Sequence, residues 1–168
     1  MWYVDSIGLV KTPRGVTIDG IQHPRNIFTL WSKADLAAIG IKPASITAVD
    51  QRYKNTGALT WNTSGAEAVG TYGTTDKDHV ALKKSMTEQV QSMAASYLSA
   101  SDWYVIREAD GGTACPADWK TYRAAVRTES NSKVTAIAAL SDLNAIIAFD
   151  AATPITAGWP NDPDYVAP

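Results

Sequence analysis

The sequence has few of the side chains that build disulfides, metal centres and nucleophilic sites. It contains one cysteine, Cys115, and two histidines, His23 and His79. A single thiol forms no intramolecular disulfide, and this supply of sulfur and imidazole is poor for zinc. The histidines fall in different predicted units, so a catalytic triad would have to be assembled across a boundary. These shortages predict no metal site, no cofactor and a protein that is not an enzyme.

Charge of one sign and long apolar runs are also lacking. The chain has 15 basic against 17 acidic side chains, which leaves no basic footprint for nucleic acid or an anionic membrane surface. The longest apolar stretch, residues 134–149, is interrupted by polar residues and is shorter than the roughly 20 residues that span a bilayer. The N-terminus has no basic region before an apolar segment, as a signal peptide would. We therefore expect a soluble, cytoplasmic chain with no nucleic-acid or membrane partner.

Strand formers and helix formers are unevenly distributed along the chain. Up to residue 72 the sequence is rich in Gly, Thr, Val and Ile, whereas helix formers dominate from Asp76 onward. This contrast predicts an α+β protein, with a small β-rich N-terminal unit over residues 1–73 and a helical unit over 74–150. Four of the eight prolines lie in residues 151–168, which predicts an extended Pro-rich tail.

Turn and cap residues divide the first unit. Strands are expected at residues 2–10, 16–21, 46–53 and 58–61, with turns at 11–15 and 19–20. A short helix should begin after Ser32, with Asp35 in its first turn and Gly40 at its end. The glycine-punctuated stretch 62–75 is expected to be a connector.

Five helical segments are expected in the second unit. The first follows Thr75 as N-cap and carries an apolar stripe that must be buried: Leu82, Met86, Val90 or Gln89, Met93 and Tyr97. Ser101 should cap a second helix that ends at the pair Gly111–Gly112, and Pro116 should open a third. A further helical stretch at 133–140 and a short helix capped by Ser141 complete the unit.

Aromatic side chains are abundant, with six tryptophans and seven tyrosines. Residues 103 and 106, and residues 119, 122 and 126, have helical spacing, which predicts that most of the aromatic surface packs in the core. The alternative is that one ring is exposed and binds a partner. Arg107 and Arg123 lie beside these stripes and can stack or form ion pairs. The tail has no core of its own, so its rings should dock on this chain or on another. The candidate partner-binding residues are Trp103, Arg107, Trp119, Tyr122, Arg123, Trp159 and Tyr165.

Carboxylates gather in the same region. Asp102, Glu108, Asp110 and Asp118 could form a hydrolytic pair, but Asp102 and Asp118 each stand in the first turn of a predicted helix, where the dipole favours an acid. A structural role is the favoured interpretation. A small hydrolase is the third-ranked hypothesis.

The block at residues 101–127, SDWYVIREADGGTACPADWKTYRAAVR, resembles a known pattern. It is similar to DW-x-V-x-R, a gap, and P-x-x-W-x-x-YR-x-x-LR, which recurs in phage tail-fibre assembly proteins and related tail-associated chaperones. Residues 23–41 and 50–53 look like the N-terminal segment and the following strand motif of the same group. His23 stands where an aromatic residue is usual, and Val126 where leucine is usual.

The resemblance implies a non-enzymatic protein that binds a phage tail-fibre or baseplate chain. It would act as an assembly chaperone in the host cytoplasm or remain as a virion component of the tail, with multiple copies as an open alternative. The β-rich first unit could add a strand to a fibre edge. The competing hypothesis is a carbohydrate- or receptor-binding module that uses exposed aromatics such as Trp61 and Trp159.

Overall fold

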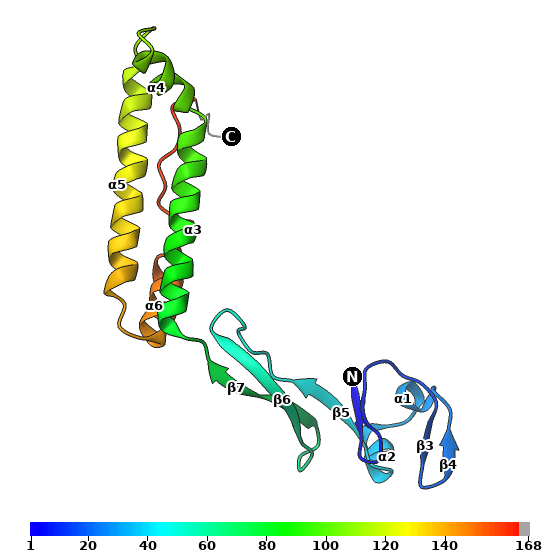
Figure 1. The fold of residues 1–168 in the computed structure, drawn as a ribbon. Coiled ribbons are helices and arrows are strands. Elements are labelled where there is room, and N and C mark those ends of the chain that lie inside the picture. Colours follow the sequence, from blue (N-terminus) through cyan, green and yellow to red (C-terminus); the bar gives the residue numbers. More distant parts are fainter. Residues whose placement is uncertain (165–168) are drawn as a thin grey trace. The chain divides into compact units, whose positions relative to one another are not determined.

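The computed structural model describes residues 1–164 (Figure 1). A β-rich N-terminal half precedes a helical half, which confirms the predicted α+β class. The chain divides into two compact units, Met1–Asp76 and Lys77–Pro168, and each is described by itself. In the described part of the chain, no helix has the length and apolar character that crossing a membrane requires.

Unit 1 contains a five-stranded sheet with strand order β2-β1-β5-β7-β6. β1 pairs with β2 and β5 in antiparallel fashion, β5 runs parallel to β7, and β6 closes the sheet antiparallel to β7. The strand bounds are β1 Trp2–Val4, β2 Gly8–Val10, β5 Ile41–Ile46, β6 Lys54–Asn62 and β7 Ala68–Asp76.

A hairpin and two short helices complete unit 1. They are β3 Val16–Ile18, β4 Ile21–His23, α1 Ile27–Leu30 and α2 Lys33–Ala38. The expected turn at Asp19–Gly20 joins β3 to β4, with φ values of 50° and 79° that suit a tight hairpin. The expected capping of the second helix is confirmed too, since the Ser32 hydroxyl accepts the Asp35 N–H and the Asp35 carboxylate accepts the Ser32 N–H.

The core of unit 1 joins one face of the sheet to these elements. Its buried members come from the strands, the hairpin and both helices: Val4, Val10, Val16, Ile18, Ile27, Phe28, Leu36 and Ile41. Trp2 and Ile39 pack against them while remaining partly exposed. The buried apolar side chains of α1 and α2 therefore cover one face of the sheet.

Three sequence-based expectations for unit 1 are wrong. The strand expected at 2–10 is two strands, β1 and β2, separated by a turn at residues 5–7. The strand expected at 46–53 stops at Ile46, because the Asp50 carboxylate accepts the Arg52 backbone N–H and forms a local turn. The expected connector at 62–75 is mostly strand β7. Its glycine at position 70 is a packing residue, since a Cβ there would lie 3.0 Å from Trp61 Cη2 and 3.2 Å from Ile46 Cγ1.

This close approach gives a test of the sheet. We predict that Gly70→Ala lowers the free energy of unfolding of unit 1 by about 1 to 3 kcal/mol, because the new methyl displaces the Trp61 ring. Gly73→Ala in the same strand is the control, since its Cβ would meet only the Ala58 carbonyl oxygen at 3.8 Å. Chemical denaturation of both variants measures the difference. Equal midpoints would contradict the packing role of Gly70.

Unit 2 is built on four helices: α3 His79–Ser99, α4 Asp102–Ala109, α5 Ala117–Ala139 and α6 Leu143–Ala152. The caps differ from those expected. α3 is capped by Asp78, because the expected cap, Thr75, lies in β7. α5 begins after Pro116, which is its N-cap. α6 is capped by Asp142 in place of the expected Ser141. α5 is one continuous helix across residues 128–132, because none of these residues is Gly or Pro and their polar side chains stay exposed or half-buried on its surface.

The helices α3 and α5 lie side by side and antiparallel (Figure 1). The Arg123 guanidinium reaches the Leu98 carbonyl at one end, and the Lys83 ammonium reaches the Ala138 and Leu140 carbonyls at the other. The predicted stripe of α3 faces inward: Val90 is fully buried with Met86 packed beside it, and Tyr97 packs on a second buried cluster around Trp119 and Tyr122.

The chain after α6 packs along this helix pair. Between Thr153 and Asp164 it forms no helix or strand in the described residues, and α6 includes the first two residues of the expected tail. Ile155 is buried, and the Trp159 ring lies 5.0 Å from the Tyr97 ring. The Lys133 ammonium donates to the Ala157 carbonyl at 2.7 Å. The tail thus docks on its own chain; Tyr165 lies outside the described residues.

Candidate functional site

The corner between α3, α4 and α5 is held by a buried arginine. One nitrogen of the Arg123 guanidinium, Nη1, donates to the Leu98 carbonyl at 2.9 Å and to the Ser101 hydroxyl at 2.7 Å. The same atom lies 2.8 Å from the Asp102 carboxylate. The carbonyl belongs to the last turn of α3, and the other two groups begin α4. Because Arg123 is almost fully buried, these polar contacts offset part of its desolvation, although its buried Nε has no hydrogen-bond partner, and they fix the path of the chain around the corner.

A second arginine shapes the loop between α4 and α5. The Arg107 guanidinium donates to the Thr113 carbonyl at 3.0 Å and to the Ala114 carbonyl at 3.3 Å. Gly112 fits under the same side chain, since a Cβ at Gly112 would lie 2.9 Å from Arg107 Cγ. The predicted helix end at the glycine pair is confirmed, and its second glycine is required by this close approach.

The loop is also tied by an ion pair. The Glu108 carboxylate accepts from the Lys120 ammonium at 2.7 Å and from the Cys115 backbone N–H at 3.2 Å. These contacts lower the pKa of Glu108, with the Lys120 hydrogen bond as the larger cause. The same hydrogen bond raises the pKa of Lys120. Glu108 therefore joins α4 to α5 as a charged group at neutral pH.

Two of the predicted aromatics form the core beneath this corner. Trp119 and Tyr122 are buried, and their rings meet edge to face with centroids 5.5 Å apart. The Tyr122 hydroxyl donates to the Tyr97 carbonyl, and burial raises the pKa of Tyr122. Together with Arg123, these residues contact their own chain, so the structure uses them for packing.

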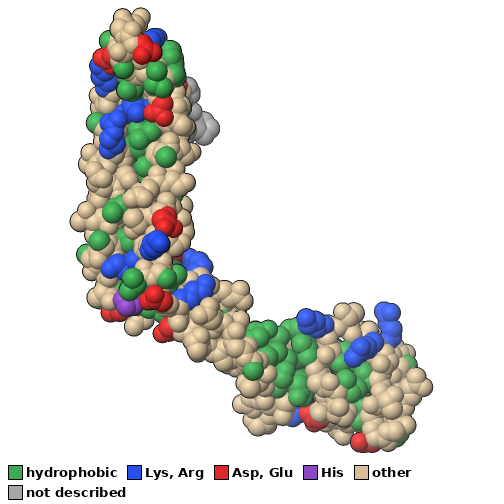
Figure 2. Space-filling view, in the orientation of Figure 1, with side chains coloured by type: hydrophobic (Ala, Val, Ile, Leu, Met, Phe, Trp, Pro, Cys, Tyr) green, Lys and Arg blue, Asp and Glu red, His purple; other side chains and the backbone are tan. Residues whose placement is uncertain are grey.

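The outward side of α4 is apolar and exposed. No residue of this helix is buried, and Trp103, Val105 and Ile106 are exposed by 51%, 41% and 61%. Helical spacing had favoured core positions for Trp103 and Ile106; this expectation is wrong, because Tyr104 takes the inward position and packs against Trp119. Figure 2 shows hydrophobic side chains beside acidic and basic ones at this end of unit 2. Trp103 and Ile106 are one turn apart and lie on the same side of the helix; we call this pair the α4 face.

Trp103 is held in place although it is exposed. Its ring stacks on Tyr104 with centroids 3.9 Å apart, and the Arg107 guanidinium lies 4.6 Å from the ring centroid. An aromatic side chain restrained in this way loses little rotamer entropy when a partner binds. The α4 face therefore presents a pre-ordered ring with an isoleucine one turn away.

The two tryptophans considered for glycan binding pack against their own chain. Trp61 lies over Gly70 and 5.0 Å from the Tyr3 ring, and Trp159 lies on Tyr97 and donates its indole N–H to the Ile155 carbonyl.

Groups with catalytic or ligand-binding potential are dispersed. The described residues include no group of three His, Cys, Asp or Glu side chains close enough to hold a metal ion. His23 contacts the edge of Trp31, His79 lies beside Asp78 at the start of α3, and Cys115 is buried. Of the four carboxylates considered for hydrolysis, Asp102 and Glu108 are in the ion pairs described above.

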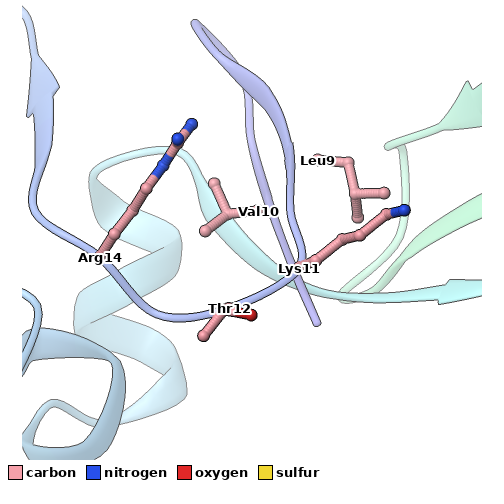
Figure 3. A pocket seen from close by; sticks show the side chains of 5 residues that line it. All are labelled: Leu9, Val10, Lys11, Thr12 and Arg14. Atoms are coloured by element: carbon pink, nitrogen blue, oxygen red, sulfur yellow. The ribbon is translucent and has the colours of Figure 1, made fainter.

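The pockets of unit 1 are shallow. One of about 350 Å³ is lined by Leu9, Val10, Lys11, Thr12 and Arg14, where β2 runs into the next loop (Figure 3). The Lys11 and Arg14 side chains extend from the loop on separate sides of Val10, so they do not converge on one point. A second pocket of about 310 Å³ is lined by Trp31, Asp35 and Ala38.

No protein-family model matches the sequence, and searches of curated proteins and of solved structures also give no match.

The buried arginine gives a direct test of the corner. We predict that Arg123→Ala destabilises the protein by about 2 to 4 kcal/mol, because the Ser101 hydroxyl and the end of α3 lose their buried partner. Arg127→Ala, an exposed position one turn later, is expected to change stability by less than about 0.5 kcal/mol. Thermal denaturation followed by circular dichroism compares the two. Similar losses for both variants would show that the corner does not depend on Arg123.

The Glu108–Lys120 pair predicts a pH dependence. The pKa of Glu108 is depressed from 4.5, so its contribution to stability is present above the unfolded value and is lost as the pH falls through the folded value. Lys120 has a raised pKa, so its contribution is lost only at high pH, as the pH rises through the folded value. Glu108→Gln should therefore make the free energy of unfolding fall less steeply as the pH is lowered. Urea denaturation of the unsubstituted chain and of the variant between about pH 2 and 7 measures this; an unchanged pH dependence in Glu108→Gln would refute the assignment.

Proposed function

We propose that this chain is a non-enzymatic phage tail-associated protein that binds a tail-fibre or baseplate chain, as an assembly chaperone or as a retained component of the virion tail. The proposal starts from the resemblance of residues 101–127 to tail-fibre assembly proteins. Its support in the structure is the α4 face, because this exposed apolar surface is built from the same block.

The residues of the block at 101–127 fall into two groups, one that packs inside the protein and one that is available for binding. Trp119, Tyr122 and Arg123 are buried and shape the corner, and Arg107 ties the loop. Trp103 and Ile106 are largely exposed, and the contacts of the Trp103 ring with Tyr104 and Arg107 leave about half of the residue open to solvent. Clustered exposed aromatic and aliphatic side chains are typical of protein-binding surfaces, and tryptophan is enriched among residues that dominate binding energy.

A fibre chain is a suitable partner in physical terms. Fibre chains are β-rich and slow to assemble, so their apolar surface and strand edges are exposed before trimerisation. A helper that covers such a surface suppresses aggregation. Unit 2 offers a rigid helical corner for this task, and unit 1 offers a sheet.

The proposal is tested by co-purification. We expect the chain to be present in intact virions or to form a stable complex with a recombinant fibre chain from the same phage. If the virion contains no copy and no fibre or baseplate chain binds it, the proposal is wrong.

The binding surface is tested by substitution. We predict that Trp103→Ala combined with Ile106→Ser weakens binding to the fibre chain at least about tenfold, because the central apolar contacts are removed. Val80→Ser is the matched control: Val80 is 62% exposed in α3, close to the 61% of Ile106, but lies outside the block. Titration calorimetry gives both dissociation constants. Equal weakening by the two changes, or none by the first, would exclude the α4 face.

A further inference from the structure

The two edges of the five-stranded sheet differ in how they are protected. β2, at one edge, is three residues long and is followed at once by Lys11 and Pro13, which blunt an edge. β6, at the other edge, is nine residues long, lacks proline and carries one charged residue, Lys54, at its beginning. Within the described residues β6 pairs only with β7, so its outer side has no strand partner.

The direction of the backbone groups on β6 follows from its neighbour. The Gly70 carbonyl of β7 accepts the Thr47 N–H at 2.9 Å, on the side of β5, so it points away from β6. Gly70 is opposite Trp61, and facing residues of an antiparallel pair direct their N–H and C=O groups either toward each other or both away. Trp61 therefore presents its N–H and C=O on the outer edge. By alternation Leu59 does the same.

The intervening residue agrees with this assignment. Thr60 should direct its backbone groups toward β7, and its hydroxyl donates to the carbonyl of the facing Thr71 at 3.1 Å. A bulge between Thr56 and Leu59 interrupts the ladder before this point. The regular part of the free edge is thus centred on Leu59 and Trp61.

The sheet face beside this edge is apolar. Leu59 and Trp61 share a face because strand side chains alternate, and Tyr72 and Gly70 are opposite them on β7. The Tyr3 ring and the Ile46 side chain contact the same cluster. Figure 2 shows hydrophobic side chains gathered on the surface of unit 1. The core helices pack on Val4 and Ile41, which belong to the opposite face.

We propose that the outer edge of β6 at Leu59 and Trp61 binds an extended strand of another polypeptide, with apolar residues at alternate positions and polar residues between them. The backbone of Leu59 and Trp61 would supply two donors and two acceptors. Alternate apolar side chains of the incoming strand would lie beside Leu59 and Trp61, and the polar ones beside Thr60 on the other face. This inference depends on the proposed function only for the source of the strand, a β-rich fibre or baseplate chain.

The test uses the full chain and a synthetic probe. The probe is a peptide of alternating valine and threonine, as long as β6, with a lysine at each end; the control peptide has proline in place of each valine. We expect the probe, and not the control, to slow amide hydrogen exchange at Leu59 and Trp61 by about tenfold or more, with no such change at Leu9 of the blunted edge. No protection at Leu59 and Trp61 with saturating probe would overturn the proposal.

A pair of variants separates backbone pairing from side-chain contact. Leu59→Pro removes an outward N–H and leaves the β7 side of the ladder intact, so it should abolish probe binding; Leu59→Ala keeps the N–H and should retain it. Circular dichroism and the exchange rates of β7 check that both variants fold. If Leu59→Pro binds the probe as Leu59→Ala does, the edge assignment is wrong.

Two further outcomes distinguish this inference from the proposed function. If a fibre chain binds and Leu59→Pro leaves its affinity unchanged, the edge proposal fails while the proposed function stands. Protection of the same amides in the free chain that rises with protein concentration, together with a dimer in sedimentation, would identify a second copy as the occupant and overturn the assignment to a foreign strand.

Discussion

The guanidinium of Arg123 holds together the end of α3, the start of α4 and the first turns of α5. It binds the Leu98 carbonyl, the Ser101 hydroxyl and the Asp102 carboxylate while almost fully buried. A buried charge of this kind is stable only where its partners are fixed, so the contacts specify one path for the chain. That path places Tyr104 inward and turns Trp103 and Ile106 toward solvent. The exposed α4 face is therefore a consequence of the interior arginine.

The same logic explains why the block at 101–127 combines tryptophan and arginine twice. Arg107 fixes the loop and flanks the exposed Trp103 ring, whereas Arg123 fixes the corner above the buried Trp119 ring. One pair serves the surface and the other serves the core. Unit 1 shows a comparable division. One face of its sheet is covered by α1 and α2, and the other face carries Leu59 and Trp61 beside the unpaired edge of β6.

Local signals in the sequence predict the local structure well. The class, the Ser32 capping box, the Asp19–Gly20 hairpin and the inward stripe of α3 depend on neighbouring residues, and all are confirmed. The strand β7 was missed because one of its glycines, Gly70, makes room for Trp61, which comes from another strand. The exposure of Trp103 was missed because helical spacing shows which residues share a face of α4 but not which face is buried. The orientation of α4 depends on Arg123, 20 positions further along the chain. The pairing of Asp102 with Arg123 leaves no signal in either helix alone.

Under the proposed function, the corner built by Arg123 would present the α4 face to a phage tail chain. The strongest test replaces Trp103 with a photo-reactive benzoylphenylalanine in the full chain, assembles phage with this variant and irradiates the particles. We expect cross-links from position 103 to a fibre or baseplate chain and none from the same group at position 80. Cross-links from position 80 alone, or particles that incorporate the variant without any cross-link from 103, would contradict the proposal.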